Sequence, residues 1–235
     1  MTPEALYRVM EATWPPAATF LAGPFCLRDG QGGGKRVSAA TAEGPWAEGD
    51  IARAEEGMAA LGQEPLFQVR AGEAALDTAL AARGYRIVDP VVGYAAPVAA
   101  FAPPPDPMTA FAHWPPLAVA ARIWAEAGIG PERIAVMARA QGPHTVVLGR
   151  TADRAAGVAF VACAGEIAML HALEVPEALR RQGTAHRILR AAAHWAQEAG
   201  VSTLSLVVTE ANAGARSLYA SFGMQAVGHY HYRTK

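Results

Sequence analysis

The stretch LHALEVPEALRRQGTAHRILRAAAHWA, Leu170–Ala196, joins a short apolar run to a helical pattern through two arginines and one glycine. The apolar run 167–175 ends at Pro176, which has no N–H for a sheet ladder, so a buried strand is predicted. From Thr184 to Gly200 apolar residues recur at helical spacing, which predicts an amphipathic helix. The stretch therefore indicates a strand, a turn and a helix.

The turn between strand and helix has the properties of an anion site. Its first backbone N–H groups have no intrahelical acceptor, and the helix dipole adds partial positive charge there. Gly183 lets the backbone approach a ligand closely, small Ala185 leaves the helix start open, and the guanidinium groups suit phosphate oxygens. A diphosphate fits this turn, and a helix start with two solvated arginines is the alternative. The turn comprises Arg180, Arg181, Gln182, Gly183, Thr184 and Ala185.

Composition limits the class of protein. Of 235 residues, 52% are hydrophobic and 17% are charged, which is typical of a globular chain with a core. A net charge of -1 offers no basic surface, so no nucleic-acid partner is expected. Cys26 and Cys163 are too few for a disulfide framework and lack metal-ligand spacing, so we expect a reducing compartment and no metal.

Two segments bear on location. The first residues, MTPEALYRVMEATWPP, include Glu4 and lack a cationic start followed by an apolar run, which argues against a signal peptide. The most apolar segment, VVGYAAPVAAFAPPP, contains four prolines, which a spanning helix would not tolerate. We therefore expect a cytoplasmic protein with no membrane partner.

The proline cluster at 103–107 predicts a linker, with an N-terminal domain over 1–101, the linker over 102–109 and a second domain over 110–235. In the second domain the patterns predict helices over 117–126, 184–199 and 212–221, and strands over 134–138, 145–148, 157–162, 167–175, 203–208 and 227–232.

The two halves end alike. ALAARGYRIVDPVVGYAAP and SLYASFGMQAVGHYHYRTK both run from a helix through a glycine and a large apolar residue into a strand, which predicts an internal duplication. Two unrelated α/β turns are the alternative. In the first half, Glu48 and Asp50 flank Gly49 at the place of the arginine turn, and would repel a diphosphate. The segment GQGGGKR, 30–36, lacks the spacing of a phosphate loop and is interpreted as a hairpin connection.

The second half resembles the GNAT superfamily of acyl-CoA-dependent N-acyltransferases over about residues 130 to 232. Its members carry an arginine or glutamine, a glycine and a small residue at the spacing of Arg180, Gly183 and Ala185. Met224 departs from the pattern, since an aromatic residue is usual there. The whole chain looks like bacterial two-lobed members of the family, in which the first lobe is a degenerate copy of the GNAT domain. The downstream matches are Asn212, Ala215, Leu218, Tyr219, Phe222 and Gly223.

The resemblance implies an α/β (α+β) GNAT fold, a mixed and mostly antiparallel sheet flanked by helices, duplicated in tandem with a degenerate first copy. It implies N-acetyltransferase activity that moves an acetyl group from acetyl-CoA to a primary amine of a small molecule or peptide. The helix start from Arg181 to His186 would hold the CoA diphosphate. The pantetheine arm would lie against the backbone of Leu173 and Val175, with an N–H near Leu173 polarising the thioester carbonyl.

The resemblance also implies catalytic roles. Tyr219 would protonate the departing thiolate, with core packing as the alternative. His171 is the preferred base because imidazole titrates near neutral pH, while a core histidine or a water chain without a single base stays open. Glu174 is a second candidate, expected on the opposite strand face from His171. Asn212 is either a helix N-cap or a cofactor contact. Acceptor contacts are expected around 114–126 and from the first lobe.

A non-catalytic acyl-CoA-binding or interaction module is the alternative function, and a proton donor such as Tyr219 near sulfur favours the enzyme. The sequence carries no acceptor motif. It sets no oligomeric state, and a homodimer is compatible with it.

Overall fold

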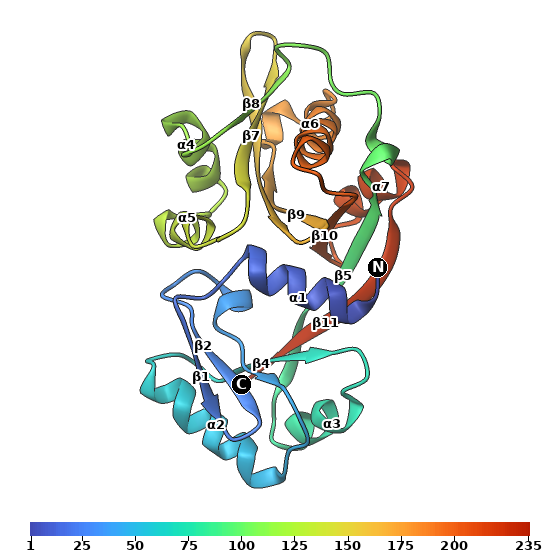
Figure 1. The fold of residues 1–235 in the computed structure, drawn as a ribbon. Coiled ribbons are helices and arrows are strands. Elements are labelled where there is room, and N and C mark those ends of the chain that lie inside the picture. Colours follow the sequence, from blue (N-terminus) through green and yellow to red (C-terminus); the bar gives the residue numbers. More distant parts are fainter.

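The computed structural model describes residues 1–235 and has two lobes, one above the other in Figure 1. The helices are α1 Pro3–Thr13, α2 Glu48–Ala60, α3 Ala74–Ala82, α4 Ala118–Glu126, α5 Pro131–Ala138, α6 Thr184–Glu198 and α7 Ala213–Ser221. The strands are β1 Ala18–Ala22, β2 Phe25–Asp29, β3 Thr41–Ala42, β4 Leu66–Arg70, β5 Arg86–Pro97, β6 Ala110–His113, β7 His144–Thr151, β8 Arg154–Ala164, β9 Ile167–Glu174, β10 Thr203–Thr209 and β11 Gln225–Thr234. Short 3-10 turns are η1 Lys35–Val37, η2 Val98–Phe101 and η3 Glu177–Leu179.

One sheet of eight strands runs through both lobes in the order β4-β11-β5-β10-β9-β8-β7-β6. Its pairs are antiparallel except β9 with β10, which are parallel. A smaller sheet, β1-β2-β3, approaches β4 through a parallel bridge between Ala40 and Phe67. The predicted mixed and mostly antiparallel sheet flanked by helices is confirmed.

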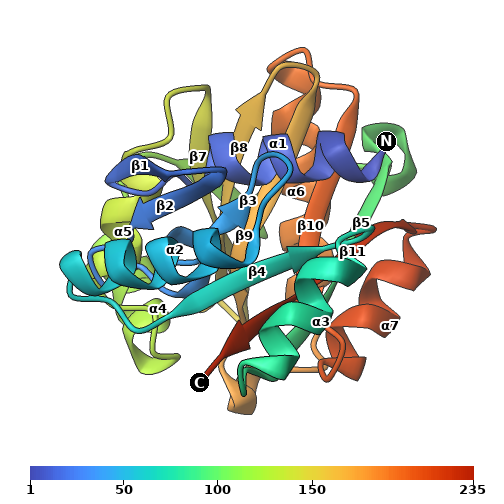
Figure 2. The same cartoon turned by 90° about the horizontal axis from the view of Figure 1, so that it is seen from below.

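The last strand of each half lies in the other half. In the first half the order is β4, α3, β5, and in the second it is β10, α7, β11. However, β5 pairs with β10 and β11 pairs with β4, while β5 and β11 pair with each other (Figure 2). The strands β5 and β11 therefore cross between the halves in space, and the linker at 102–109 with the domain bounds on either side stays a prediction.

The order of elements repeats between the halves. The series α2, β4, α3, β5 matches α6, β10, α7, β11, and the parallel bridge of Ala40 with Phe67 takes the place of the parallel pair β9 and β10. This repeat agrees with the duplication that the sequence predicts. A degenerate origin of the first copy stays a prediction.

Two cores lie on opposite faces of the second-half sheet. Along β8, Ala159 and Val161 pack in the core under α6 and α7, while Val158 and Phe160 pack in the core under α4 and α5. This alternation buries β8 on both faces. The predicted apolar face of α6 is buried, namely Ile188, Leu189, Ala192, Ala193 and Ala196.

One predicted element is wrong. The run 134–138 was expected to be a strand, but it lies in helix α5. Pro131 stands at the helix start, where its fixed φ suits the first turn, and Glu132 adds a favourable charge there. Val136 and Met137 are the buried residues of this helix. None of the helices combines the length and hydropathy needed to cross a membrane.

Candidate functional site

The turn before α6 presents a row of free backbone N–H groups. Gly183 is the N-cap with φ of 77°, and Arg181 also has positive φ, 63°. The first backbone hydrogen bond of the helix runs from the N–H of Arg187 to the carbonyl of Gly183, at 3.1 Å. The N–H groups of residues 181–186 therefore have no acceptor within the protein. Such a row at a helix start is an anion site.

The two arginines of this turn differ in their contacts. Arg180 donates through Nε to the carbonyl of Val175 at 3.0 Å, and its guanidinium lies 3.5 Å from the Glu174 carboxylate. It ties the end of β9 to the turn. Arg181 is exposed and forms no ion pair or side-chain hydrogen bond, so its charge is free for a ligand.

A cavity of about 260 Å³ lies beside the turn, and it was not predicted from the sequence. Gln182, Arg187 and Arg150 line it, and Arg187 donates to the Thr151 hydroxyl. The guanidinium of Arg187 also packs against Gly183, since a Cβ there would lie 3.0 Å from Nη1. The one sequence signal for Arg187 is its place one helical turn after Gly183. Its neighbours Arg150 and Thr151 come from the end of β7, so the sequence could not predict that they meet Arg187.

Strands β9 and β10 separate next to this turn. Their pairing runs from Ile167 with Thr203 to Leu170 with Leu206 and stops there. Strand β10 continues along β5 as far as Thr209. Leu173, near the end of β9, and Val175, just after it, are half-buried and border the opening, and their contact with an extended ligand arm stays a prediction.

The expected opposite orientation of His171 and Glu174 is wrong. His171 pairs with Phe160 and Glu174 pairs with Val158, so β9 contains one residue more than β8 between these pairs. Ala172, with φ of 50°, lies in this β-bulge. Because paired residues share a sheet face, the bulge places both side chains on the face of Phe160.

His171 is held by groups from the first half. Its Nε2 lies 2.9 Å from the Thr13 hydroxyl, its Nδ1 lies 2.9 Å from Nη1 of Arg36, and its ring centroid is 4.9 Å from that of Trp14. A guanidinium only donates, so Nδ1 accepts and the proton resides on Nε2. Thr13 in turn donates to the carbonyl of Val9 at 2.6 Å.

These contacts oppose a role for His171 as a base. The lone pair of Nδ1 already accepts from Arg36, and a second proton on the ring would place an imidazolium in contact with the Arg36 guanidinium. Burial, and then the charge of Arg36, hold the pKa of His171 well below its usual value of 6.5. The ring is 4% exposed, so the core-histidine alternative describes it. No sequence pattern predicts Arg36 or Thr13 as its partners, because both come from distant parts of the chain.

The low pKa of His171 predicts a stability that falls with acid. Below pH 6.5 the unfolded histidine binds a proton while the folded ring stays neutral, so the unfolded state is favoured as pH decreases. Between pH 7.5 and 5.5 this group should reduce the free energy of unfolding by about 1.4 kcal/mol. Urea unfolding of the wild type and His171→Gln at both pH values measures the difference.

In His171→Gln the acid-dependent loss should shrink by that amount, because glutamine keeps a donor and an acceptor and does not titrate. His194→Gln is the matched control, since the side chain of His194 is exposed on α6. An identical pH dependence in the wild type and His171→Gln would contradict a neutral buried ring.

Tyr219 lies on the opposite face of the sheet from His171. Its side chain is 5% exposed in the core under α6, and its ring is 6.0 Å from that of Tyr94. Burial raises the pKa of the phenol, and no hydrogen bond to its hydroxyl opposes this. The phenol is therefore protonated at neutral pH and its proton is uncommitted. The ring packs as the alternative describes, and the acid role stays a prediction.

Two other predicted ligand residues have local contacts. Asn212 is the N-cap of α7, because its Oδ1 accepts from the N–H of Ala215 at 3.0 Å. This matches the structural alternative, and a cofactor contact stays a prediction. His186 packs its ring 5.1 Å from Phe222, and burial lowers its pKa, with a smaller effect from Arg190.

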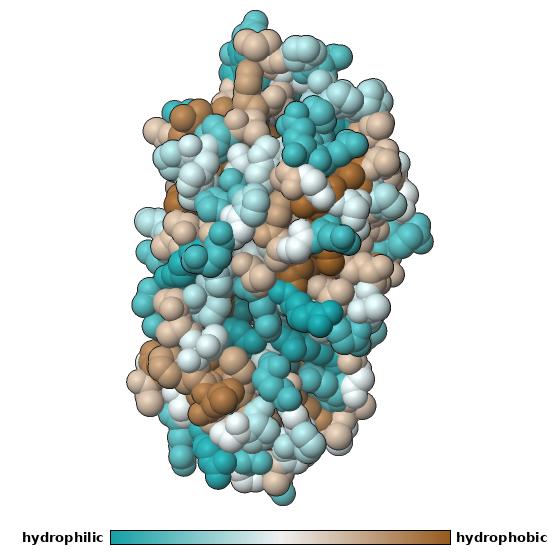
Figure 3. Space-filling model, in the orientation of Figure 1, coloured by the Kyte–Doolittle hydropathy of each residue, from teal (hydrophilic) through white to brown (hydrophobic).

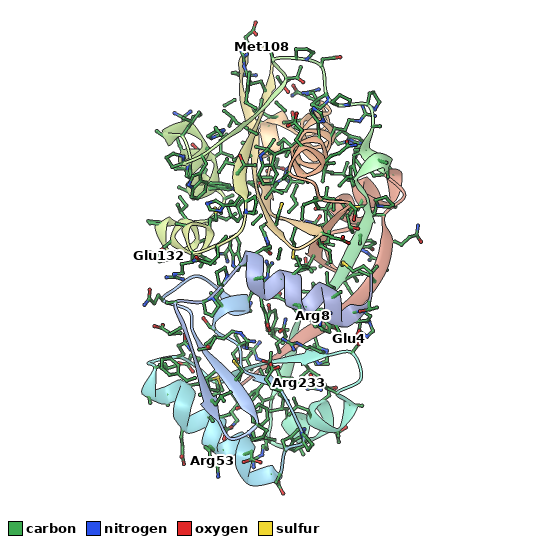
Figure 4. The ribbon with its side chains drawn as sticks, in the orientation of Figure 1. Glu4, Arg8, Arg53, Met108, Glu132 and Arg233 are labelled. Carbon is green, nitrogen blue, oxygen red and sulfur yellow. The ribbon has the colours of Figure 1, made fainter.

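A pocket of about 280 Å³ lies against His171 at the waist between the lobes. Figure 3 shows hydrophilic residues gathered at this level, and Figure 4 places Glu132, at the start of α5, beside the first half. The segment 114–126, where acceptor contacts were expected, contributes nothing to the pocket lining. Residues of η1, β5, α5 and β11 line it instead, together with Trp14 just after α1 and the residues of β9 and β10 beside the opening.

Comparison with known proteins identifies the class. The sequence profile described as the acetyltransferase (GNAT) family matches residues 104–224, about half of the chain. The chain therefore belongs to the GNAT acetyltransferase family, as its motifs predict. No curated protein sequence matches it.

Solved structures share the fold over nearly the whole chain. A GCN5-related N-acetyltransferase from Kribbella flavida is 18% identical with a TM-score of 0.70, covering 98% of this chain and 95% of its own. A functionally unknown conserved protein from Staphylococcus epidermidis is 11% identical with a TM-score of 0.69 and 93% coverage of each chain. A tandem GNAT protein from the clavulanic acid biosynthesis pathway is 14% identical with a TM-score of 0.64, covering 98% and 87%. At these identities the likeness is one of fold.

Proposed function

We propose that the chain transfers an acetyl group from acetyl-CoA directly to a primary amine of a small molecule or peptide. The observation that carries this proposal is the row of unpaired amides at 181–186, placed beside the opening between β9 and β10. A diphosphate and an extended amide-containing arm need these two features side by side. The family supports acyl transfer in general.

The residues present fit coenzyme A. The amides from Arg181 to His186 would donate to the diphosphate, and the left-handed Gly183 keeps the row open to an anion. Gln182, Thr184 and Ala185 lie within this row, and Asn212 would add a contact from the start of α7. Leu173 and Val175 would flank the arm. When bound, acetyl-CoA supplies an acyl group activated as a thioester.

In the proposed reaction the amine nitrogen bonds to the acyl carbon as the carbon–sulfur bond breaks. Tyr219 gives its proton to the departing sulfur and recovers one from water, while the amine releases its proton to water. The amide and free CoA are the products. We propose no side-chain base, because Arg36 engages His171 and Arg180 engages Glu174. This is the water-chain alternative from the sequence.

The first half should not bind a second CoA. At the start of α2 the Asp50 carboxylate accepts from the N–H of Ala47 at 2.9 Å and pairs with Arg53 at 3.0 Å. The helix start therefore already has its own anion, whereas the start of α6 has none. This contrast supports a degenerate first copy over 1–101 and a catalytic domain over 110–235.

Release of free thiol from acetyl-CoA in the presence of a mixed amine panel tests the proposal. We expect thiol release that depends on the amine, with an equal amount of acetylated amine found by mass spectrometry. Binding of CoA by calorimetry without thiol release from any amine would favour the non-catalytic module.

A further inference from the structure

The pocket at the waist has an excess of positive charge. Lys35, Arg36 and Arg133 line it, and Asp89 is the one carboxylate among its lining residues. Lys35 forms an ion pair with Asp89, and both side chains are about half exposed. After this pair cancels, two guanidinium charges remain.

These two guanidinium groups have no anionic partner. Neither Arg36 nor Arg133 forms an ion pair. Arg36 donates to Nδ1 of His171 through Nη1, and its guanidinium lies 5.6 Å from the centre of the Trp14 ring. Both arginines are half-buried, so solvent screens their charge less than at an open surface. Guanidinium groups that line a pocket without a carboxylate partner can form charge-assisted hydrogen bonds to an anion held there.

The pocket also reaches the reaction centre proposed above. Val207, Val208 and Thr209 line it from β10, beyond the last pair with β9, and Ala172 lines it from the bulge. These residues border the opening where the acyl group would lie. A molecule in this pocket is therefore placed to offer its amine to the thioester.

Positive lining has opposite effects on the two ends of an acceptor. It repels an ammonium ion and therefore favours loss of the amine's proton. This suits a site in which the lone pair of His171 accepts from Arg36 and is not available as a base. A molecule with only cationic groups would be held poorly by this lining. An acceptor that also carries an anion would gain charge-assisted bonds to the guanidinium groups.

We propose that the acceptor is a small amine bearing an anionic group, a carboxylate or a phosphate, which binds Arg36 and Arg133 while the amine faces the opening between β9 and β10. This inference rests on the proposed acetyl transfer and names its substrate class. A lysine-rich peptide or a polyamine is thereby disfavoured.

A matched series of acceptors tests the charge preference. We expect kcat/KM for 4-aminobutyrate to exceed that for 4-aminobutanamide on the order of ten- to hundred-fold, the effect of one charge-assisted contact, and that for 1,4-diaminobutane by more. Phosphoethanolamine and ethanolamine form the phosphate pair, and 4-aminobutyrate and its amide form the carboxylate pair. The pair with the larger ratio of kcat/KM identifies the preferred anion. Equal values within both pairs, or the diamine as the best acceptor, would overturn the inference.

Substitutions assign the preference to the pocket. Arg133→Ala should erase most of the ratio between 4-aminobutyrate and its amide, and Arg133→Lys should retain part of it. Arg122→Ala is the matched control, because Arg122 is exposed on α4, pairs with Glu126 and does not line the pocket. An unchanged ratio in Arg133→Ala would contradict the assignment.

A binding measurement separates this inference from the proposed function. If no amine releases thiol, calorimetry still measures the affinity of the pocket for 4-aminobutyrate and for 1,4-diaminobutane on CoA-saturated protein. Tighter binding of the carboxylate compound, lost in Arg133→Ala, would uphold the inference while the acetyl transfer fails. Equal or tighter binding of the diamine would overturn the inference by itself.

Discussion

Replacing Gly183 by glutamate is expected to abolish CoA binding. Its φ of 77° costs a residue with a Cβ about 1–2 kcal/mol, and that Cβ would crowd the Arg187 guanidinium. The new carboxylate would also compete with a diphosphate for the free amides and repel it at short range. In calorimetry the stoichiometry should fall from near one CoA per chain to near zero. Thermal unfolding followed by circular dichroism checks that the fold remains.

Gly49→Glu is the matched control for this substitution. Gly49 lies at the corresponding helix start in the first half, with nothing within 4 Å of a Cβ and no positive φ. We expect unchanged CoA binding in this variant. Gly183→Ala, which adds strain without charge, should bind more weakly than the wild type. Two CoA molecules per chain, or wild-type affinity in folded Gly183→Glu, would refute a single site at α6.

The second large effect is expected for Tyr219→Phe, with kcat lower by ~10²–10⁴-fold and CoA affinity nearly unchanged. The phenol acts only as the sulfur leaves, so its loss affects turnover more than binding. Phenylalanine keeps the ring packing in the core, and the hydroxyl has no hydrogen bond within the protein to lose. Steady-state and single-turnover kinetics at saturating acetyl-CoA and acceptor measure the change.

Tyr94→Phe provides the comparison, since its ring lies beside that of Tyr219 and its hydroxyl accepts from Arg216 at 3.4 Å. We expect a small effect on kcat there. Equal single-turnover rates for the wild type and Tyr219→Phe would assign the tyrosine to core packing alone.

Local signals predicted the part of the site that is built from one continuous stretch. The strand, the turn and the helix start around Gly183 follow from the proline, the glycine and the apolar period, all within Leu170–Ala196. The free amides also follow, because every helix start leaves several donors without intrahelical partners. The carboxylates beside Gly49 could likewise be predicted to repel a diphosphate, because Glu48 and Asp50 adjoin the glycine in the sequence.

Features that depend on distant partners could not be predicted. The ring of His171 is fixed by Thr13 and Arg36, more than a hundred residues away along the chain. The bulge at Ala172 moves Glu174 to the face of His171, and strict alternation contains no sign of an extra residue. The run 134–138 is too short to separate strand from helix by period, and the proline before it was the better signal.

The exchange of β5 and β11 has a consequence for the order in which the protein forms during synthesis. The strand that pairs with β4 comprises residues 225–234, and the strand that pairs with β10 comes from residues 86–97. When the first half emerges from the ribosome, β4 has an open edge and β5 has no neighbour. Both must wait until β10 and β11 have been made. The nascent first half is thus exposed to edge-to-edge association until translation passes residue 234, and factors that shield it should matter most in that interval.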